Sequence, residues 1–358
     1  MSQHNTSKAD RLSGIDLARS LALFAMIMVN FRLAMGVTTS SSQTLLGIFE
    51  ALQGRAAACF VILAGIGLQL GSARLAQHDA RRRLILRAFF LMVAGLLNLL
   101  VFPADIMHYY ATFFMIAAFL LPLSNRQLLI LIASIVVVAL ALLFVLDYGR
   151  GWNFAELSYA SFGSWQGMSV DFPRHLFFNG WHPVFPWMAF LIWGMFLARQ
   201  NLSETKIQKR LMMVGGAVTL SCSLMSYVGK AQLPQWADLF SLQPMPALPL
   251  YVIAAAGSAS AIIGLCCWFS HHAQSWQMVS GILRWLTPVG RMSLTLYVAH
   301  ILIGMGTLEG LGWLQGRTLH EVLLATCIYF LGSIVFCQLW SLRWKQGPLE
   351  MLMRRISQ

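Results

Sequence analysis

Charged residues are scarce in this chain of 358 residues: Asp, Glu, Lys and Arg make up 11% of it, whereas hydrophobic residues make up 58%. An ordinary soluble domain contains about 25% charged residues, so the composition excludes that class. Apolar runs near the 20 residues needed to cross a bilayer recur along nearly the whole sequence, separated by short polar segments. We therefore predict an all-α polytopic membrane protein without a large soluble domain.

Cysteine contributes only six residues, and all of them lie in apolar segments. None forms a CxxC pair or a ligand cluster, so we expect neither a disulfide framework nor a metal site. The sequence also lacks a phosphate-binding glycine loop, a GxSxG nucleophile elbow and an HExxH motif. Hydrolases of these kinds and nucleotide-driven pumps therefore lose support.

Acidic residues are few as well, 13 against 25 Lys and Arg, and the net charge of +12 raises the question of nucleic acid binding. The positions of the basic residues argue against it, because with the N-terminus inside, 19 of the 25 fall on the cytoplasmic side. The six on the other side are Arg32, Arg55, Arg150, Arg174, Lys230 and Arg317. This asymmetry is the usual topological signal and leaves no basic patch for a nucleic acid.

Ten transmembrane helices account for the apolar runs, with both termini cytoplasmic and residues 1–358 forming one domain. The expected spans are 17–36, 55–72, 86–102, 109–122, 128–147, 183–199, 211–229, 249–269, 290–308 and 320–340. Lys8 and Arg11 before the first run could also open a secretory signal peptide. Because the run is long for a signal peptide and nine more spans follow, we interpret it as an uncleaved first helix.

Polar side chains inside an apolar helix are costly unless they are paired, so they are candidates for function. The first run, GIDLARSLALFAMIMVNF, contains Asp16, Arg19 and Asn30. Asp16 and Arg19 share a helix face, and Asn30 returns to about the same face roughly 21 Å further along. Asp16 and Arg19 could form a simple ion pair at the cytoplasmic end, but Asn30 needs a partner in the bundle.

A second candidate is PADIMHYYA, where Asp105 and His108 are three residues apart. On the first turn of a helix, a carboxylate at this spacing can orient an imidazole and raise its basicity, as a general base requires. The alternative is a helix-capping Asp beside an exposed His.

Two further candidates are the histidines His182 and His300. His182, in NGWHPVFPWMAFLIWGMFLAR, precedes a helix that opens with proline, and it could equally belong to an interfacial aromatic belt. His175, seven residues earlier in a loop, ranks below it. In GRMSLTLYVAH, Arg291 stands where an anionic cofactor would dock, and His300 lies nine residues deeper, where it needs a partner or a wet cavity. A structural hydrogen bond is the alternative for His300.

The first-helix pattern resembles the opening of the transmembrane acyltransferase superfamily, in which Asp, an Arg three residues on and a polar residue fourteen on recur. The acyltransferase-3 branch has His at the last place, and the heparan-alpha-glucosaminide N-acetyltransferase branch has Asn, as this chain does at Asn30. Four further stretches resemble the YeiB-like bacterial branch, in the same order: ADIMHYYA, NGWHPVFPWMAFLIWGMFLAR, GRMSLTLYVAH and QGPLEMLMRR. The resemblance covers residues 11 to 355.

The chain departs from the family pattern at three places. Ser20 replaces the glycine that usually follows the first-helix Arg, and Leu296 replaces the usual Asn of the GRM segment. The catalytic His of the glucosaminide enzyme, in the loop after its first helix, has no counterpart in TTSSSQ at residues 38–43. A base would therefore have to come from elsewhere, from His182 or His108.

The resemblance implies an enzyme that takes an acyl group, acetyl above all, from cytoplasmic acetyl-CoA and delivers it to a periplasmic hydroxyl or amine. Basic residues at the cytoplasmic helix ends could hold the CoA phosphates, namely Arg19, Arg82, Arg83 and Arg291, with Asp16 and His300 on the same cofactor path. His182, or His108 oriented by Asp105, would deprotonate the acceptor or carry the acyl group, and Asn30 would donate to the oxyanion. The setting would be a bacterial inner membrane.

The acceptor is left open, with a carbohydrate among the candidates. The segment 147–182 carries Trp152, Tyr159, Trp165 and Trp181, whose rings would suit a sugar, although interfacial aromatics are common without any ligand. From the residues alone, a transporter or exporter of a polar solute fits the buried charges nearly as well, and a scaffold leaves them unexplained. Direct transfer or an acyl-histidine, and a homodimer or a monomer, also remain open.

Overall fold

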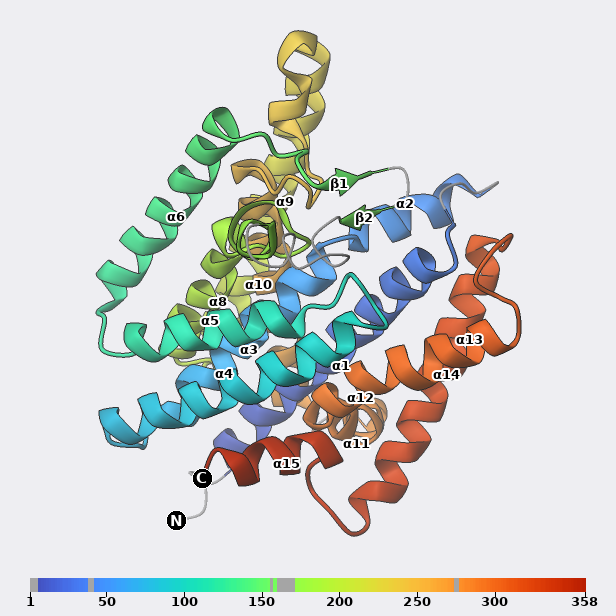
Figure 1. The fold of residues 1–358 in the computed structure, drawn as a ribbon. Helices are drawn as coiled ribbons and strands as arrows, with labels where there is room; N and C mark the ends of the chain where they lie inside the picture. The colour runs from blue at the N-terminus through green and yellow to red at the C-terminus, as the bar shows by residue number, and fades with distance from the viewer. Residues whose placement is uncertain (1–5, 38–41, 155–156, 160–170, 274–276) are drawn as a thin grey trace. The chain divides into compact units, whose positions relative to one another are not determined.

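Helices form nearly all of the regular structure in the computed structural model, which describes residues 6–37, 42–154, 157–159, 171–273 and 277–358 (Figure 1). The first half contains α1 (Thr6–Ala34), α2 (Gln43–Leu52), α3 (Arg55–Ser72), α4 (Gln77–Leu99), α5 (Met107–Leu120), α6 (Asn125–Val145), α7 (Phe172–Arg174) and the π-helix η3 (His175–Asn179). The second half contains α8 (Val184–Ala198), α9 (Thr205–Gln232), the 3-10 helix η4 (Pro234–Phe240), α10 (Pro249–His272), α11 (Gln277–Arg291), α12 (Ser293–Ala299), the π-helix η5 (His300–Met305), α13 (Gly306–Gly310), α14 (Leu319–Ser341) and α15 (Pro348–Ile356).

One short antiparallel hairpin interrupts the helices, formed by β1 (Trp152–Asn153) and β2 (Ser158–Tyr159). In its register Trp152 is opposite Tyr159, and Asn153 is opposite Ser158.

The helices confirm an all-α membrane protein. Within the described residues, six stretches are long and apolar enough to cross a membrane: Ser13–Ala34, Gln43–Ser72, Asn125–Val145, Thr205–Gln232, Pro249–His272 and Leu319–Ser341. The number rises to eight if two bent pairs of helices are each counted as one span. These pairs are Phe172–Asn179 with Val184–Ala198, and Met278–Arg291 with Ser293–Gly310. Large apolar side chains point outward on these helices, among them Phe144 (73% exposed) and Leu220 (72%), as lipid contact requires.

Ten continuous spans are not confirmed in the described part of the chain. The expected span 86–102 lies in α4, where every 18-residue stretch contains Arg82, Arg83 and Arg87, and the span 109–122 lies in α5, which has only 14 residues. The span 290–308 is broken, because the chain bends by 71° between α11 and α12.

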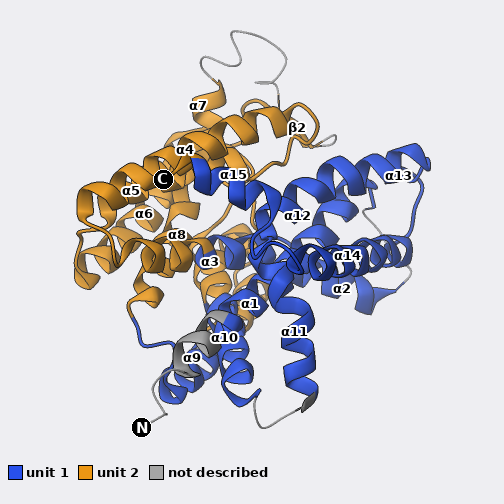
Figure 2. Cartoon of the chain, turned by 90° about the horizontal axis from the view of Figure 1, so that it is seen from below, with its two compact units in different colours: residues 1–63, 200–217, 257–355 blue, residues 64–199, 218–256, 356–358 orange. Residues whose placement is uncertain are grey.

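The chain forms two compact units, residues 1–63, 200–217 and 257–355 in the first and residues 64–199, 218–256 and 356–358 in the second (Figure 2). In the first unit, α1 packs against α2, α11, α12 and α14. A Cβ atom at Gly290 would come within 1.9 Å of the Asp16 carbonyl oxygen, so only glycine permits this approach of α11 to α1. Ser20 Oγ adds a hydrogen bond across the same contact, donating to the Leu286 carbonyl at 2.6 Å.

In the second unit, α4 and α5 pack as neighbours, and α8 packs against α5 and α6. A Cβ atom at Gly95 would lie 2.4 Å from the His108 backbone nitrogen, so glycine lets α4 touch the start of α5. The core is aromatic: Tyr109, Trp187 and Tyr251 are fully buried. The start of α5 is therefore closely packed against α4 and α8.

Candidate functional site

Asp16 is bound by two arginines in the first unit. Arg19 Nη1 donates to Asp16 Oδ1 at 2.9 Å, and Arg291 Nε donates to Asp16 Oδ2 at 3.2 Å. The carboxylate is 9% exposed, whereas the side chains of Arg19 and Arg291 are 25% and 47% exposed. Each bond to Asp16 uses one of the five N–H donors of its guanidinium. The arrangement orients two arginines and leaves both with surface that an anionic group such as a phosphate can reach.

Asn30 is hydrogen-bonded to His300, which lies in the same unit. Asn30 Nδ2 lies 3.0 Å from His300 Nε2, and His300 Nδ1 bonds to the Tyr297 carbonyl oxygen. Because a carbonyl only accepts, Nδ1 carries the ring proton of the neutral imidazole, and Nε2 accepts from the Asn30 amide. Asn30 retains a second N–H, which could donate to another group.

The ring of His300 is fully buried beside those of Phe31 and Tyr297, and Phe31 also contacts Tyr329. The ring centroids of Phe31 and His300 lie 6.3 Å apart, and those of Phe31 and Tyr329 lie 5.8 Å apart. Tyr329 also donates its hydroxyl to the Leu296 carbonyl on α12 at 3.1 Å. The ring of His300 thus meets Asn30, and its place on the cofactor path with Arg291 stays a prediction.

Asp105 and His108 form a completely buried pair at the start of α5 in the second unit. His108 Nδ1 donates to Asp105 Oδ2 at 3.2 Å, and the same oxygen accepts from the Met107 backbone N–H at 2.7 Å. Asn98 Nδ2 donates to Asp105 Oδ1 at 2.7 Å. Asp105 therefore does bind the first turn of the helix, but His108 is not an exposed neighbour. Its proton lies on Nδ1, which leaves the lone pair on Nε2.

Three histidines surround Tyr109. Its ring centroid lies 4.0 Å from that of His108, 5.9 Å from that of His175 and 5.7 Å from that of His182. The Tyr109 hydroxyl accepts from the Trp181 backbone N–H at 3.1 Å and lies 2.9 Å from His175 Nδ1, to which it can donate. The structure thus brings together the two histidines chosen from the sequence and adds His175 and Tyr109 to them.

Three buried ring nitrogens in this cluster have no hydrogen-bond partner among the described residues: His108 Nε2, His182 Nδ1 and Trp187 Nε1. The rings of His182 and Trp187 are in edge contact at 4.5 Å. Buried polar atoms are nearly always bonded to protein or water, so these three nitrogens are available to water or to a polar ligand.

Asn179, at the end of η3, holds the hairpin onto this cluster. It donates to the Tyr148 and Arg150 carbonyls at 2.9 Å, and Tyr159 donates to its Oδ1 at 3.1 Å. Burial raises the pKa of the Tyr159 hydroxyl above its usual value, and the bond to Asn179 opposes the shift only in part. Trp152 Nε1 donates to the Asn179 carbonyl at 2.6 Å.

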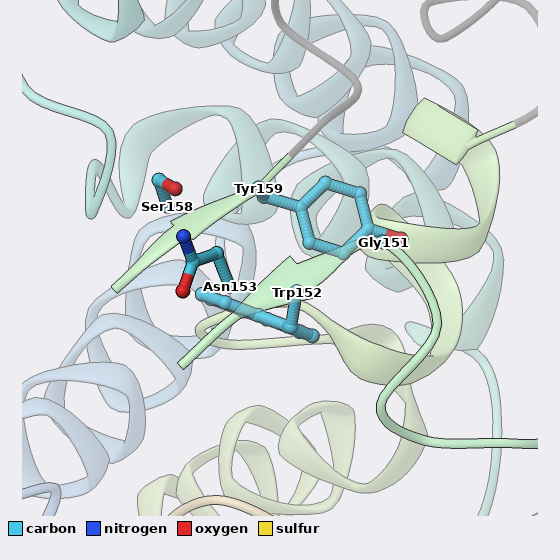
Figure 3. A pocket seen from close by; sticks show the side chains of 5 residues that line it. All are labelled: Gly151, Trp152, Asn153, Ser158 and Tyr159. Carbon is cyan, nitrogen blue, oxygen red and sulfur yellow. The ribbon is translucent and has the colours of Figure 1, made fainter. Parts of the chain in front are cut away.

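The hairpin lines a cavity of about 370 Å³, bordered by Gly151, Trp152, Asn153, Ser158 and Tyr159 (Figure 3). Gly151 lies against the Tyr159 ring, where a Cβ atom would come within 2.8 Å. The volume is within the range of small-molecule pockets, roughly 300–1,000 Å³. Trp165, the fourth aromatic residue chosen from this segment, lies outside the described residues, as does Thr38 to Ser41 of the TTSSSQ loop.

The remaining predicted residues divide between the units. Arg82, exposed, and Arg83, partly buried, lie on α4 in the second unit, whereas Arg19, Arg291 and Asn30 lie in the first. A common cavity for Asn30, His108 and His182 therefore stays a prediction. In the described part of the chain, no group of three His, Cys, Asp or Glu side chains is placed to hold a metal ion.

Two family models match the chain. The model described as heparan-alpha-glucosaminide N-acetyltransferase, catalytic, matches residues 11–239, and the DUF418 model, described as a protein of unknown function, matches residues 194–358. The fold and the first match define a membrane protein of acetyltransferase-like function. The chain belongs to the heparan-alpha-glucosaminide N-acetyltransferase catalytic family. The resemblance to the YeiB-like branch of the transmembrane acyltransferase superfamily is also confirmed. No curated protein and no solved structure matches the chain.

Proposed function

We propose that this protein is a membrane acyltransferase that moves an acetyl group from cytoplasmic acetyl-CoA to a hydroxyl or amine at the periplasmic face of a bacterial inner membrane. The family match supports the acetyltransferase class. The donor, the acceptor and the two sides of the membrane are our proposal, as are ten membrane crossings with both termini in the cytoplasm. The excess of basic residues on the segments assigned to the cytoplasm supports that orientation.

One observation supports the chemistry above all others, the Asp105–His108 pair with its unbonded, buried Nε2. Asp105 holds the proton on Nδ1 and would stabilise the imidazolium, as the carboxylate does in other base pairs of this kind. Nε2 would take the proton from the acceptor hydroxyl or amine as that group attacks the acyl carbon. The C–S bond then breaks, and the CoA thiolate leaves and is protonated.

The donor would bind through arginines. Asp16 orients Arg19 and Arg291, whose exposed surfaces suit the CoA phosphates, and Arg82 and Arg83 would add to them. The second N–H of Asn30 would donate to the oxyanion that forms when the acceptor attacks the acyl carbonyl.

The acceptor would be a carbohydrate, bound beside Trp152 and Tyr159 and ordered by the polar atoms of Asn153 and Ser158. The cavity of the hairpin and its connection to η3 through Asn179 support this assignment. His182 and Trp187 offer further unbonded nitrogens to a polar acceptor in the same unit.

The test is acetyl transfer by the purified full-length protein, supplied with acetyl-CoA and a panel of sugars and amino sugars. Release of free CoA thiol and labelled acetyl on the acceptor are measured together. His108→Asn should lower kcat by about 10²- to 10⁴-fold, the usual contribution of a general base. His78→Asn is the matched control, because the His78 side chain is 87% exposed and bonds only to its neighbour Asp79. Equal turnover by a folded His108→Asn variant, or no transfer by the unaltered protein to any acceptor, would contradict the proposal.

A transporter or exporter of a polar solute is the second candidate. The two helix pairs bent by 56° and 71° favour it, because broken helices often form substrate sites in transporters. Solute flux into proteoliposomes without any acyl-CoA would support transport over transfer.

A further inference from the structure

The Glu350 carboxylate on α15 binds the first turn of α12, the helix that precedes His300. Glu350, on α15, accepts from the Leu294 backbone N–H at 2.7 Å and from the Thr295 backbone N–H at 3.2 Å, both with Oε1. Thr295 Oγ1 donates to Glu350 Oε2 at 2.5 Å. One side chain thus satisfies two backbone donors and one hydroxyl at the start of α12.

The contact is tight on the side of α15 as well. The Leu349 backbone N–H donates to Thr295 Oγ1 at 3.0 Å, so this hydroxyl is bonded in both directions. A Cβ atom at Gly347 would lie 2.6 Å from Thr295 Oγ1 and 2.4 Å from Glu350 Oε2, so glycine is needed for the approach. Burial raises the pKa of the Glu350 carboxyl, and the bonds from Thr295 and Leu294 oppose that shift.

His300 follows directly after the other end of α12. Six residues separate Leu294 from His300, about 9 Å along a helix. The ring nitrogen Nδ1 bonds to the Tyr297 carbonyl, which is itself part of α12, while Nε2 meets Asn30 on α1. A rotation or shift of α12 therefore moves the Tyr297 carbonyl, which accepts the hydrogen bond from the His300 ring, relative to Asn30.

The junction before α12 makes such a shift possible. The chain bends by 71° between Arg291 and Ser293, so α11 does not continue into α12 and cannot set its rotation as an unbroken helix would. At the start of α12, Glu350 accepts from the backbone N–H groups of Leu294 and Thr295, and Tyr329 donates its hydroxyl to the Leu296 carbonyl.

We propose that Glu350 is a positioning residue: through α12 it sets the orientation of the His300 ring against Asn30. The proposal rests on the proposed acyl transfer only for its kinetic consequence, and the orientation of the ring can be measured without any substrate. Through Glu350, which is 50 residues after His300 in the sequence, the segment QGPLEMLMRR then helps to orient the Asn30–His300 pair.

The experiment compares Glu350→Ala, Glu350→Gln and Thr295→Val in the full-length protein, with histidines labelled with ¹⁵N and the His300 signals assigned by their loss in His300→Gln. Glu350→Ala should shift the His300 nitrogen signals and lower kcat by about tenfold or more, with KM for acetyl-CoA unchanged. Glu350→Gln should restore both, because its amide oxygen can accept from Leu294 and its NH₂ can donate to Thr295 Oγ1. Glu309→Ala, which removes an exposed carboxylate on α13, should change neither.

Unchanged His300 signals in a folded Glu350→Ala variant would overturn the proposal. If Glu350→Ala does not fold, Thr295→Val makes the same test, because it removes the bridging hydroxyl and keeps the volume; a shift supports the proposal and no shift contradicts it. If the unaltered protein transfers no acetyl group, the proposed function fails, but the nitrogen signals still decide the role of Glu350.

Discussion

The amide of Asn30 lies 3.0 Å from Nε2 of His300, and the other ring nitrogen bonds to the Tyr297 carbonyl. These two bonds specify one neutral tautomer of a completely buried imidazole. Asn30 is therefore both the orienting partner of His300 and a donor with one N–H to spare.

Asn30→Ala should lower the turnover of acetyl-CoA by about 10²- to 10³-fold, the usual effect of removing one oxyanion donor. The affinity for acetyl-CoA should not change, because Asp16 and its arginines are intact. Steady-state kinetics and calorimetric binding measure the two effects. Asn201→Ala, which removes an amide bonded to Glu204 at the exposed surface, is the control. A parallel loss of binding and turnover in the Asn30 variant would argue against this role.

Asp105→Asn should lower both stability and kcat, although Asn and Asp have nearly the same shape. The Asp105 carboxylate accepts hydrogen bonds from four donors: Asn98 Nδ2, the Met107 and His108 backbone N–H groups, and His108 Nδ1. An amide NH₂ in place of one oxygen would face a donor, which costs about 1–3 kcal/mol of stability in a buried site. We expect kcat to fall about 10²- to 10⁴-fold.

Thermal unfolding and single-turnover transfer test this expectation. Asp79→Asn is the matched control, since the Asp79 side chain is 65% exposed. Full activity of Asp105→Asn would show that His108 does not need its carboxylate.

Gly290→Ala should destabilise the first unit, because the added methyl group would press on the Asp16 carbonyl oxygen at 1.9 Å. Overpacking of this kind costs about 1–3 kcal/mol, and here it also pushes Arg291 away from Asp16. Gly281→Ala, in the same helix, meets nothing within 4 Å and should instead be neutral or stabilising. The melting temperatures of the two variants in detergent test this prediction. Gly290→Ala should melt at a lower temperature than Gly281→Ala, and equal values would contradict the close contact between α1 and α11.

Local geometry made part of the site predictable from the sequence. The spacings of Asp16 with Arg19 and of Asp105 with His108 follow from the helix period alone, and both pairs are bonded in the structure. The pairing of Asn30 with His300 joins residues 270 apart, for which the sequence carries no periodic signal. His175 was ranked low as a loop residue, but η3 turns it into the core beside Tyr109.

The fold was predictable to a similar extent. Hydrophobic runs indicate membrane helices, and six of the ten expected ranges coincide with stretches that meet the criteria of length and composition. The break at Met292 was missed because no proline stands there: Pro288 is four residues earlier, inside α11. The contact of Glu350 with Leu294 and Thr295 depends on the path of the chain after α14, which the pattern of residues does not specify.

The stability of the protein should depend on pH through Glu350. Its pKa in the folded protein is raised from the usual 4.5, mainly by burial, so the folded state binds the proton more tightly than the unfolded state. Stability contributed by this group is present below about pH 4.5 and is lost as the pH rises through the folded pKa. Glu350→Gln lacks the titration, so its melting temperature relative to the unaltered protein should increase from pH 4 to pH 8.

Glu309→Gln, on the exposed surface of α13, should show no such trend. A constant offset between Glu350→Gln and the unaltered protein would mean that Glu350 does not titrate differently on folding.

The most direct test of the account is the binding of acetyl-CoA to the purified full-length protein and to two variants, each first shown to be folded by its melting curve. We predict that the unaltered protein binds acetyl-CoA and that Arg19→Ala loses at least about tenfold in affinity. Arg126→Ala, which removes an exposed arginine in the first turn of α6, should bind normally. No binding by intact protein, or equal binding by Arg19→Ala, would contradict an acyl-CoA enzyme whose donor is held at Asp16, Arg19 and Arg291.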